Sequence, residues 1–444
     1  MSRHPEMRRY AQAIFDHALD AVRVERVFNR HIQASRGVLR IGEDLYSLSN
    51  YSRIYVVAIG KAAHPMASAL AAQIGAVASG VVVCPDNNKE NGQVMGLRYF
   101  HGGHPVPNQE SIRAAEVILK ALPQLDSQAL VIYLLSGGGS AMCETPLDSS
   151  LTLDDIIETY HALVHSGASI AEINTIRKHL SAIKGGRLAE AAAKNHPQQV
   201  TIALSDVPDN ALDALASGPT LPDATTAENC YLIAEKYGLV VEFPPKVREY
   251  FEKKLLVETT KHDDAAFVNT RWLNIASNAT ALKAAEEKAL ELGFIVQTDN
   301  SCDDQDYSRA ADFLLERLRH MQFTNPGRQV CLLSGGEVAV KVPEEHGTGG
   351  RNQHFTLDCA VKIACENICL LSAGTDGVDG NSTAAGAIAD GQTLSRYSLL
   401  GVSTSLSSQL AQFDSNTVFQ QLNDSIITGP TGTNVRDVRI LVAW

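Results

Sequence analysis

The sequence lacks paired cysteines, long hydrophobic runs and a signal peptide, and each absence excludes a class of protein. Its eight cysteines are scattered and form no CxxC pair; the closest two, Cys365 and Cys369, have three residues between them. This spacing predicts neither a zinc site nor a disulfide framework, and it favours a reducing compartment. The longest apolar run, from Ala129 to Leu135, is too short to cross a membrane. The N-terminal stretch MSRHPEMRRY has no apolar core, so we expect a cytoplasmic protein without a membrane partner.

The sequence also has no excess of basic residues. It contains 38 Lys and Arg against 50 Asp and Glu, a net charge of −12. Nucleic-acid binding needs a basic surface that neutralises phosphates, so the charge excludes nucleic acid as the main partner. A local basic pocket for a small phosphorylated ligand is compatible with an acidic protein. We therefore expect small-molecule partners and, for the assembly, a monomer or a homodimer.

Three familiar nucleotide and nucleophile motifs are absent. A dinucleotide fingerprint that starts at Gly137 would need glycine at position 142, as would a GxSxG nucleophile elbow, but Met142 stands there. The stretch GKA at 60–62 lacks the upstream glycine and the hydroxyl residue of a phosphate-binding P-loop. These absences exclude, by motif, a standard nicotinamide oxidoreductase, a serine hydrolase and a P-loop kinase.

What the sequence does contain is a regular alternation of apolar strands and helices. Continuous apolar runs predict strands at 54–60, 80–84, 129–135 and 199–204, with helical patterns between them at 109–122 and 152–166. Such an alternation indicates an α/β fold with a mostly parallel sheet covered on both faces.

The pattern breaks at 240–268, where the chain is charged and carries Pro244 and Pro245. Strands and helices resume beyond it, with predicted strands at 329–333 and 367–371 among them. We therefore predict two α/β domains: residues 1–245, a linker region at 246–268, and a smaller domain at 269–444.

Polar residues follow five of the predicted strands. Ligands of open α/β sheets bind at the carboxyl ends of strands, so these positions favour a shared cleft over a set of unrelated tight turns. The five strand ends carry Gly60–Lys61, Ser136–Ser140, Ser205–Asp209, Ser334–Glu337 and Ser372–Gly377.

The second of these strand ends is the most distinctive. In LLSGGGSAM, Gly137, Gly138 and Gly139 let the backbone approach an anion closely, and Ser136 and Ser140 add hydroxyl donors. The loop is a candidate cradle for a phosphate or a carboxylate. The alternative is a plain turn without a ligand.

Two further stretches place arginine where it could hold an anion. Asn174, Arg177, Ser181 and Lys184 fall on one stripe at helical spacing, which is either an anion site or a solvated basic face. In GTGGRNQHF, Arg351 and Asn352 follow three glycines, and a helix begins at about Gln353. A helix N-terminus next to an arginine is a second candidate, and a flexible glycine hinge is the alternative.

Carboxylates near these strand ends are candidate Mg²⁺ ligands, since Mg²⁺ prefers carboxylate and phosphate oxygens. Asp206 and Glu337 follow strands directly and rank above the others. Each acid alone is otherwise a turn or capping residue, and HGGHP at 101–105 is a weak candidate metal site. The acids considered are Asp206, Asp209, Glu337, Asp376 and Asp379.

Taken in order, the motifs resemble those of the class II glycerate 2-kinases, which join a large N-terminal domain to a C-terminal MOFRL domain. The resemblance covers nearly the whole chain and is weakest in the first fifty residues and near 240–268. The motifs are GKAA (60–63), GGHPVPN (102–108), LLSGGGSA (134–141), INTIRKHLSAIKGGRLA (173–189), ALSDVPDN (203–210), SGPT (217–220), SGGE (334–337), GTGGRNQ (347–353), GTDGVDG (374–380) and TGPTGTNVRDV (428–438).

The resemblance implies a Rossmann-like α/β/α N-terminal domain and a smaller α/β MOFRL domain, with the active site in the cleft between them. It also implies an enzyme that uses ATP and Mg²⁺ to phosphorylate the 2-hydroxyl of D-glycerate. Lys61 and Arg351 match residues thought to be functional in the family. We predict that Lys61 stabilises the transferring phosphoryl group, and that Arg351 or Arg177 pairs with the substrate carboxylate. Asp206 accepts the hydroxyl proton or holds Mg²⁺, with Glu337 and Asp376 as further candidate ligands, and the glycine loop cradles phosphates.

Two rival functions stay open. Similar proteins are often named hydroxypyruvate reductase, an NAD(P)H-dependent activity, with His104 and His179 as candidate acid–base residues that lack evident partners. The other rival is a non-catalytic sensor of sugar acids or sugar phosphates, which would need no metal site.

Overall fold

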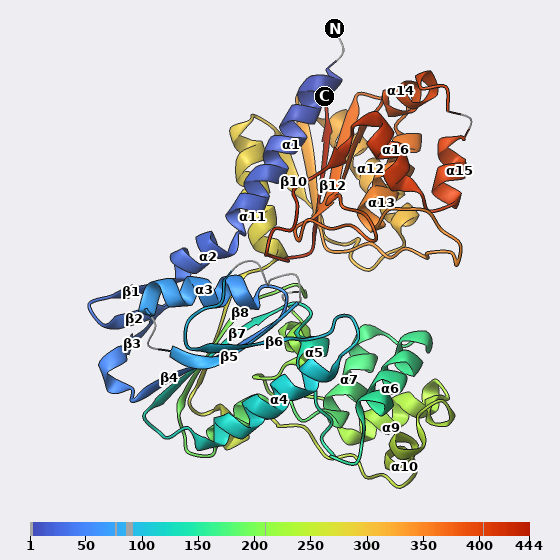
Figure 1. Ribbon diagram of the computed structural model, residues 1–444. Coiled ribbons are helices and arrows are strands. Elements are labelled where there is room, and N and C mark those ends of the chain that lie inside the picture. The colour runs from blue at the N-terminus through green and yellow to red at the C-terminus, as the bar shows by residue number, and fades with distance from the viewer. Residues whose placement is uncertain (1–2, 76–77, 86–91, 209, 403) are drawn as a thin grey trace. The chain divides into compact units, whose positions relative to one another are not determined.

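The computed structural model describes residues 3–75, 78–85, 92–208, 210–402 and 404–444. By its internal contacts the chain divides into an N-terminal unit, Val27–Ile275, and a C-terminal unit, Met1–Arg26 with Ala276–Trp444. Each unit is built around one six-stranded sheet. Figure 1 shows these sheets together with the helices that pack on them.

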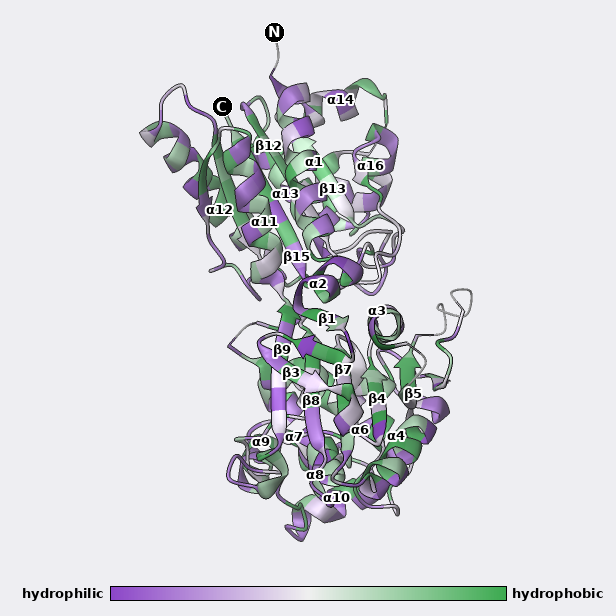
Figure 2. Cartoon of the chain, turned by 90° about the vertical axis from the view of Figure 1, so that its left-hand side faces the viewer, coloured by the Kyte–Doolittle hydropathy of each residue, from purple (hydrophilic) through white to green (hydrophobic). Residues whose placement is uncertain are grey.

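The N-terminal unit has the strand order β6-β5-β4-β7-β8-β9, and the described pairings among β4 to β8 are all parallel. Every residue of β7 is buried, as expected for a central strand covered on both faces. Figure 2 shows β4 and β5 mostly in the green of hydrophobic residues. The strands are β4 (Arg53–Ile59), β5 (Ala78–Cys84), β6 (Leu97–His101), β7 (Ala129–Ser136), β8 (Gln198–Leu204) and β9 (Thr270–Ala276).

Helices cover both faces of this sheet. Figure 1 shows α3 on one side and α4 on the other, which follows from right-handed crossovers that leave the central strand in opposite directions. A small antiparallel sheet of β1 (Ile32–Ser35), β2 (Val38–Ile41) and β3 (Asp44–Ser47) belongs to the same unit. The helices are α2 (Val24–His31), α3 (Ala63–Ile74), α4 (Gln109–Ala121), α5 (Gly139–Met142), α6 (Leu153–His165), α7 (Ile170–Leu180), α8 (Arg187–Ala193), α9 (Ala227–Lys236) and α10 (Pro245–Glu252).

The C-terminal unit has a mixed sheet, in the order β10-β11-β15-β12-β13-β14, in which β15 runs antiparallel to both of its neighbours. Its strands are β10 (Ile295–Thr298), β11 (Val330–Gly335), β12 (Ile368–Gly374), β13 (Gly386–Asp390), β14 (Ser425–Ile426) and β15 (Asp437–Ala443). Its helices are α1 (His4–Ala21), α11 (Asn278–Glu291), α12 (Tyr307–Thr324), α13 (Arg351–Lys362), α14 (Thr393–Leu399), α15 (Leu406–Ala411) and α16 (Ser415–Leu422). The predicted α/β class with two domains is confirmed.

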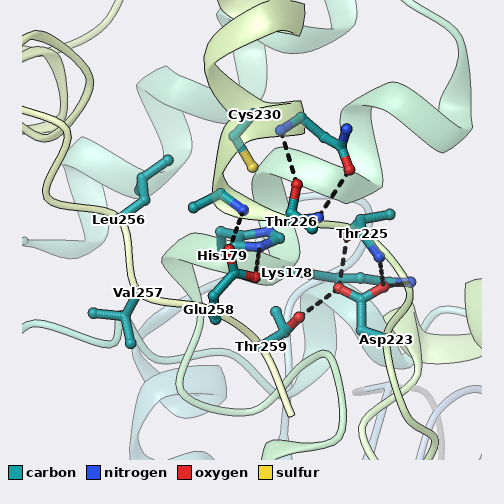
Figure 3. Close-up of polar contacts among 12 residues, drawn as sticks. Lys178, His179, Asp223, Thr225, Thr226, Cys230, Leu256, Val257, Glu258 and Thr259 are labelled. Carbon is teal, nitrogen blue, oxygen red and sulfur yellow. Dashed lines mark hydrogen bonds and ion pairs between the residues drawn. The ribbon is translucent and has the colours of Figure 1, made fainter. Parts of the chain in front are cut away.

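The boundaries of the two units differ from the expected 1–245 and 269–444. Helix α1 packs in the C-terminal unit, where Arg8 pairs with Asp390 and Asp424. The expected linker at 246–268 lies within the N-terminal unit. The carbonyl oxygens of Val257 and Glu258 accept hydrogen bonds from the buried Arg187 of α8, and the Glu258 carboxylate lies 3.7 Å from His179 at the end of α7. Figure 3 shows this stretch next to His179.

Candidate active site

The carboxyl ends of β4 and β7 lie side by side where the strand order of the N-terminal sheet changes direction. Numbered along the chain, the strands read third, second, first, fourth, fifth and sixth across the sheet, the order of doubly wound nucleotide-binding folds. In such folds ligands bind beyond the carboxyl ends of the two strands at the reversal. Gly60 and Lys61 follow β4, and the glycine loop follows β7, so both predicted phosphate loops lie at this point.

The two loops are in direct contact. The Lys61 N–H donates to the Gly137 carbonyl at 2.8 Å, and the Ala62 N–H donates to Ser136 Oγ at 3.0 Å. Gly60 has φ +120°, and a Cβ at this position would lie 2.4 Å from the Ser136 carbonyl oxygen. Only glycine permits this approach. Ser136 is therefore a buried residue that joins the loops, and the position of Lys61 depends on it.

Asp206 lies against the glycine loop from the neighbouring strand β8. A Cβ built on Gly137 would be 1.8 Å from Asp206 Oδ2, so this carboxylate occupies the space that a larger residue would fill. The φ of Gly137 is negative, so its backbone conformation does not require glycine. Glycine is needed here because a Cβ would clash with Asp206. The geometry brings Asp206 to the same strand ends as Lys61.

His104 is a neighbour of this group that the sequence analysis gave no kinase role. Its Nε2 is 3.3 Å from a Cβ built on Gly138. Burial lowers the pKa of His104, and the positive charge of Lys61 lowers it further. The imidazole is therefore neutral at neutral pH and lies within electrostatic reach of Lys61. The motif GGHPVPN was the available signal.

Ser140 and Asn174 are joined through Ser217, another residue without a predicted role. The hydroxyls of Ser140 and Ser217 are 2.9 Å apart, and Ser217 donates weakly to Asn174 Oδ1 at 3.5 Å. Ser217 and Ala216 both have positive φ, of 60° and 49°. Such backbone conformations are costly for residues with side chains and cluster at functional sites.

A pocket of about 470 Å³ opens next to the glycine loop. Gly138 and Ser140 contribute to one wall, and Arg177 contributes to another. The guanidinium of Arg177 lies 4.3 Å from the ring centroid of Tyr160. Its buried Nε has no hydrogen-bond partner among the described residues, and burial lowers the pKa of this arginine. Arg177 thus brings an unneutralised positive charge to an apolar pocket.

Lys184 does not continue the predicted helical stripe, because α7 ends at Leu180. Lys184 has no exposed surface and forms an ion pair with the equally buried Glu144. Glu144 also accepts hydrogen bonds from Ser181 Oγ, at 2.6 Å, and from the Tyr160 hydroxyl. The stripe of Asn174, Arg177, Ser181 and Lys184 is therefore corrected: its last two members form a buried network behind the pocket.

Arg351 lies in the C-terminal unit at the first position of α13, with two carboxylate partners. Its Nε and Nη2 donate to the two oxygens of Asp437 at 2.6 and 3.1 Å, and Nη2 also lies 2.7 Å from Glu337 Oε1. Burial opposes the charge of Arg351, but Asp437 and Glu337 outweigh burial and raise its pKa. Asp437 lies in the TGPTGTNVRDV motif and was given no role.

The N-terminus of α13 is already occupied by a carboxylate of the chain. The N–H groups of Asn352 and Gln353 donate to the two oxygens of Asp379, at 3.0 and 2.8 Å. Ser372 Oγ donates to the side-chain oxygen of the buried Asn352 at 2.6 Å. Burial raises the pKa of Asp379 to about 6, although these N–H groups oppose the shift. The expectation of a free anion site at this helix is corrected, since Asp379 fills it.

The predicted metal ligands are divided between the units: Asp206 in the N-terminal unit, Glu337 and Asp376 in the C-terminal unit. Across the described residues, no group of three or more His, Cys, Asp or Glu is arranged to hold a metal ion. Asp376 Oδ1 accepts a hydrogen bond from the Val378 N–H at 3.2 Å. Asp209 lies outside the described residues.

The five polar strand ends are likewise divided between two sheets. Those at 60–61, 136–140 and 205–206 belong to the N-terminal sheet, and those at 334–337 and 372–377 to the C-terminal sheet.

In the described part of the chain, no helix is long and apolar enough to cross a membrane.

Comparisons with known proteins agree with this organisation. Residues 10–252 match the profile of a domain of unknown function, DUF4147, and residues 330–437 match the MOFRL family. A D-glycerate 2-kinase of Thermotoga maritima is 37% identical over 398 residues, which cover 88% of this chain and 91% of that protein. An Agrobacterium vitis protein with the provisional name hydroxypyruvate reductase is 36% identical and is covered to 99%, against 88% of this chain.

The crystal structure of a glycerate kinase from Thermotoga maritima superimposes with a TM-score of 0.84 at 34% identity, covering 99% of this chain and 100% of that one. The DUF4147 match spans more than half of the chain, and the MOFRL match follows it. The chain therefore belongs to the class II glycerate kinase family, in which a DUF4147 domain precedes a MOFRL domain.

Proposed function

We propose that this protein is a D-glycerate 2-kinase, which transfers the γ-phosphoryl group of ATP to the 2-hydroxyl of D-glycerate and releases ADP and 2-phospho-D-glycerate. The observation that carries the proposal is the meeting of Lys61, Asp206 and the glycine loop at the reversal of a nucleotide-binding strand order. Its relatives include a D-glycerate 2-kinase that is similar over most of the chain.

Phosphoryl transfer depends on positioning and on charge neutralisation. In the proposed mechanism Lys61 stabilises the negative charge on the transferring group. Asp206 accepts the proton of the attacking hydroxyl or binds the metal ion. The loop from Ser136 to Ser140 supplies backbone N–H groups for phosphate oxygens, and the contact between Lys61 N–H and Gly137 keeps the lysine beside it.

The two arginines proposed to bind substrate anions, Arg177 and Arg351, differ in the partners that they already have. Arg177 has no carboxylate partner among the described residues, so an anionic substrate group is the partner it lacks. Arg351 already pairs with Asp437 and Glu337, and its side chain keeps 35% of its surface exposed. We therefore propose that Arg351 is a preoriented charge and that a substrate oxygen competes with Glu337 for it.

Mg²⁺ fits the chain as an ion that arrives with ATP. Mg²⁺ keeps several waters and is held by one or two carboxylates together with substrate phosphates. The described residues form no cage of three ligands, which agrees with that mode of binding. The candidates for these one or two carboxylates are Asp206 in the N-terminal unit and Glu337 or Asp376 in the C-terminal unit. We also propose a cytoplasmic location, which the eight free cysteines, seven of them buried, support. For the assembly we propose a monomer or a homodimer.

The test is to incubate the purified protein with D-glycerate and Mg-ATP and to identify the product by phosphorus NMR. We expect 2-phosphoglycerate, whereas 3-phosphoglycerate would keep the kinase and overturn the regiochemistry. A parallel reaction with hydroxypyruvate and NADH or NADPH, followed by absorbance, tests the reductase named in Agrobacterium vitis. Oxidation of the nicotinamide without a phosphorylated product would overturn the proposal.

A further inference from the structure

The 470 Å³ pocket beside the glycine loop has a chemistry that a three-carbon acid does not match. We propose that this pocket binds the base and ribose of ATP, and that Arg177 binds one of the phosphates next to the ribose. This inference rests on the proposed kinase activity, and it assigns the nucleoside to residues of the N-terminal unit alone.

The first argument is size. Pockets for drug-sized ligands have volumes of roughly 300–1,000 Å³, and this pocket, at about 470 Å³, falls in that range. Glycerate has three carbons and would leave most of the space empty. A nucleoside, with a fused ring system and a sugar, is a ligand of the expected size.

The second argument is the nature of the walls. Helix α6 presents Ile157, Tyr160 and Val164 to the pocket, and the segment after β6 presents Val106 and Pro107. Val164 is 59% exposed and Val106 is 38% exposed, which is a large apolar exposure for two residues at one opening. Glycerate, with its carboxylate and two hydroxyls, has little apolar surface with which to cover them. The flat, largely apolar faces of a base would cover this exposed aliphatic surface.

The third argument is that the aromatic wall is held rigid from behind. The Tyr160 hydroxyl donates to Glu144, and Lys184 Nζ lies 3.2 Å from the same hydroxyl. Glu144, Lys184 and Tyr160 are all buried. This network holds the Tyr160 hydroxyl in place and so anchors the side chain on which Arg177 packs. It also explains why Lys184, which does not line the pocket, is present beside it.

The fourth argument is the unneutralised charge. Arg177 packs on one face of the Tyr160 ring, and its buried Nε lacks a partner among the described residues. Adenosine alone would leave that charge unpaired. A phosphate attached to the ribose would pair with it, since guanidinium groups suit phosphate oxygens.

The fifth argument is continuity with the phosphate loop. Gly138 and Ser140 line the pocket and also belong to the loop that meets Lys61. A nucleotide with its base against α6 can therefore extend its phosphates along residues 138–140 towards Lys61.

Two substitutions in the full-length protein test the proposal. Val164→Trp fills the apolar end of the pocket from an exposed position, and Val241→Trp places the same residue at an exposed position that does not line this pocket. Binding of Mg-ADP and of Mg-tripolyphosphate is measured by calorimetry. We expect Val164→Trp to weaken ADP binding at least about tenfold, which corresponds to about 1.4 kcal/mol, with little effect on tripolyphosphate. Val241→Trp leaves both unchanged.

Arg177→Met completes the design, because it removes the charge and keeps apolar bulk. We expect it to weaken both ADP and tripolyphosphate binding. If Val164→Trp leaves ADP binding unchanged and instead raises KM for D-glycerate, the pocket belongs to the acceptor and the proposal is overturned. Since the calorimetry needs no turnover, ADP binding that responds as expected in a protein without kinase activity would overturn the proposed function and keep the pocket assignment. Melting temperatures confirm that each variant folds.

Discussion

Arg177 in the N-terminal unit and Arg351 in the C-terminal unit differ in whether acidic residues of the chain neutralise their charge. In the N-terminal unit Arg177 lies in an apolar pocket without an acidic partner among the described residues. In the C-terminal unit Arg351 is held by Asp437 and Glu337, and the start of α13 is filled by Asp379. Both arginines were predicted from the sequence as anion ligands, but their surroundings differ. The charge of Arg177 needs a ligand to neutralise it, whereas the charge of Arg351 is already neutralised by carboxylates of the chain. A charge count in a motif does not reveal this difference, but the partners do.

The largest effect should come from removing the charge at the strand reversal of the N-terminal unit. We expect Lys61→Ala to lower kcat about 1,000-fold or more, the size of effect seen for charges that stabilise a transferring phosphoryl group. The measurement is steady-state kinetics with D-glycerate and Mg-ATP, with circular dichroism to confirm folding. Near-normal turnover would show that the strand reversal is not the reaction centre, and the contrast between the units would lose its functional meaning.

The N-terminal unit also contains a buried charge that does have a partner. The ion pair between Lys184 and Glu144 therefore contrasts with Arg177. Lys184→Met leaves the Glu144 carboxylate buried without its cation. We expect the free energy of unfolding to fall by about 3–5 kcal/mol, the usual effect of removing one partner of a buried ion pair. Urea unfolding measures the loss. The additional substitution Glu144→Leu should recover much of it, since an apolar pair of similar volume is tolerated at such sites. Lys236→Met, which breaks an exposed pair with Glu172, should leave the urea midpoint unchanged.

Matched glycine substitutions compare the strand ends of the two sheets. Gly137→Ala places a Cβ where Asp206 Oδ2 now lies, at 1.8 Å, whereas Gly374→Ala in the C-terminal unit meets Asp376 and Asp437 at 3.2 and 3.3 Å. We expect Gly137→Ala to displace Asp206 and to lower kcat about 100-fold, in the range for a lost charge-stabilising group. Gly374→Ala should lower kcat only a few-fold. Equal effects would contradict the placement of the reaction centre on Asp206.

The smallest expected effect concerns pH and the C-terminal unit. Burial raises the pKa of Asp379 to about 6 in the folded state, above the ordinary aspartate value of about 3.9. The folded state therefore binds this proton more tightly, so Asp379 adds stability as the pH falls from above 6 towards 4 and loses that contribution as the pH rises again. Asp379→Asn should flatten the pH dependence of the unfolding free energy in this window. An unchanged slope would show that Asp379 is ionised throughout.

Local patterns predicted the strands well, because the central strands are buried on both faces and read as continuous apolar runs. They also placed Lys61, Ser136 and Asp206 at strand ends, which the parallel sheet brings together. The failures come from distant partners. Lys184 is buried because Glu144, 40 positions earlier, pairs with it. The anion site at α13 is filled by Asp379, which lies 27 positions beyond Asn352.

The domain boundary differs from expectation for a similar reason. An amphipathic helix shows which of its faces is buried but not which sheet covers it, and α1 packs against α11, β12 and β15. Charge and proline at 240–268 indicated a linker, but the backbone carbonyls of this segment accept hydrogen bonds from the buried Arg187. The composition of residues 240–268 cannot reveal this contact, because Arg187 lies 70 positions before Val257 in the sequence.

The place of α1 has a consequence for the order in which the protein folds during synthesis. Domains generally fold as units while the chain emerges, but in the C-terminal unit α1 precedes the whole N-terminal unit along the chain, and the central strand β15 follows it. The apolar face of α1 therefore stays uncovered until the N-terminal unit and then β15 have been synthesised. During that interval the nascent chain offers chaperones an exposed amphipathic helix next to a unit that can already be complete.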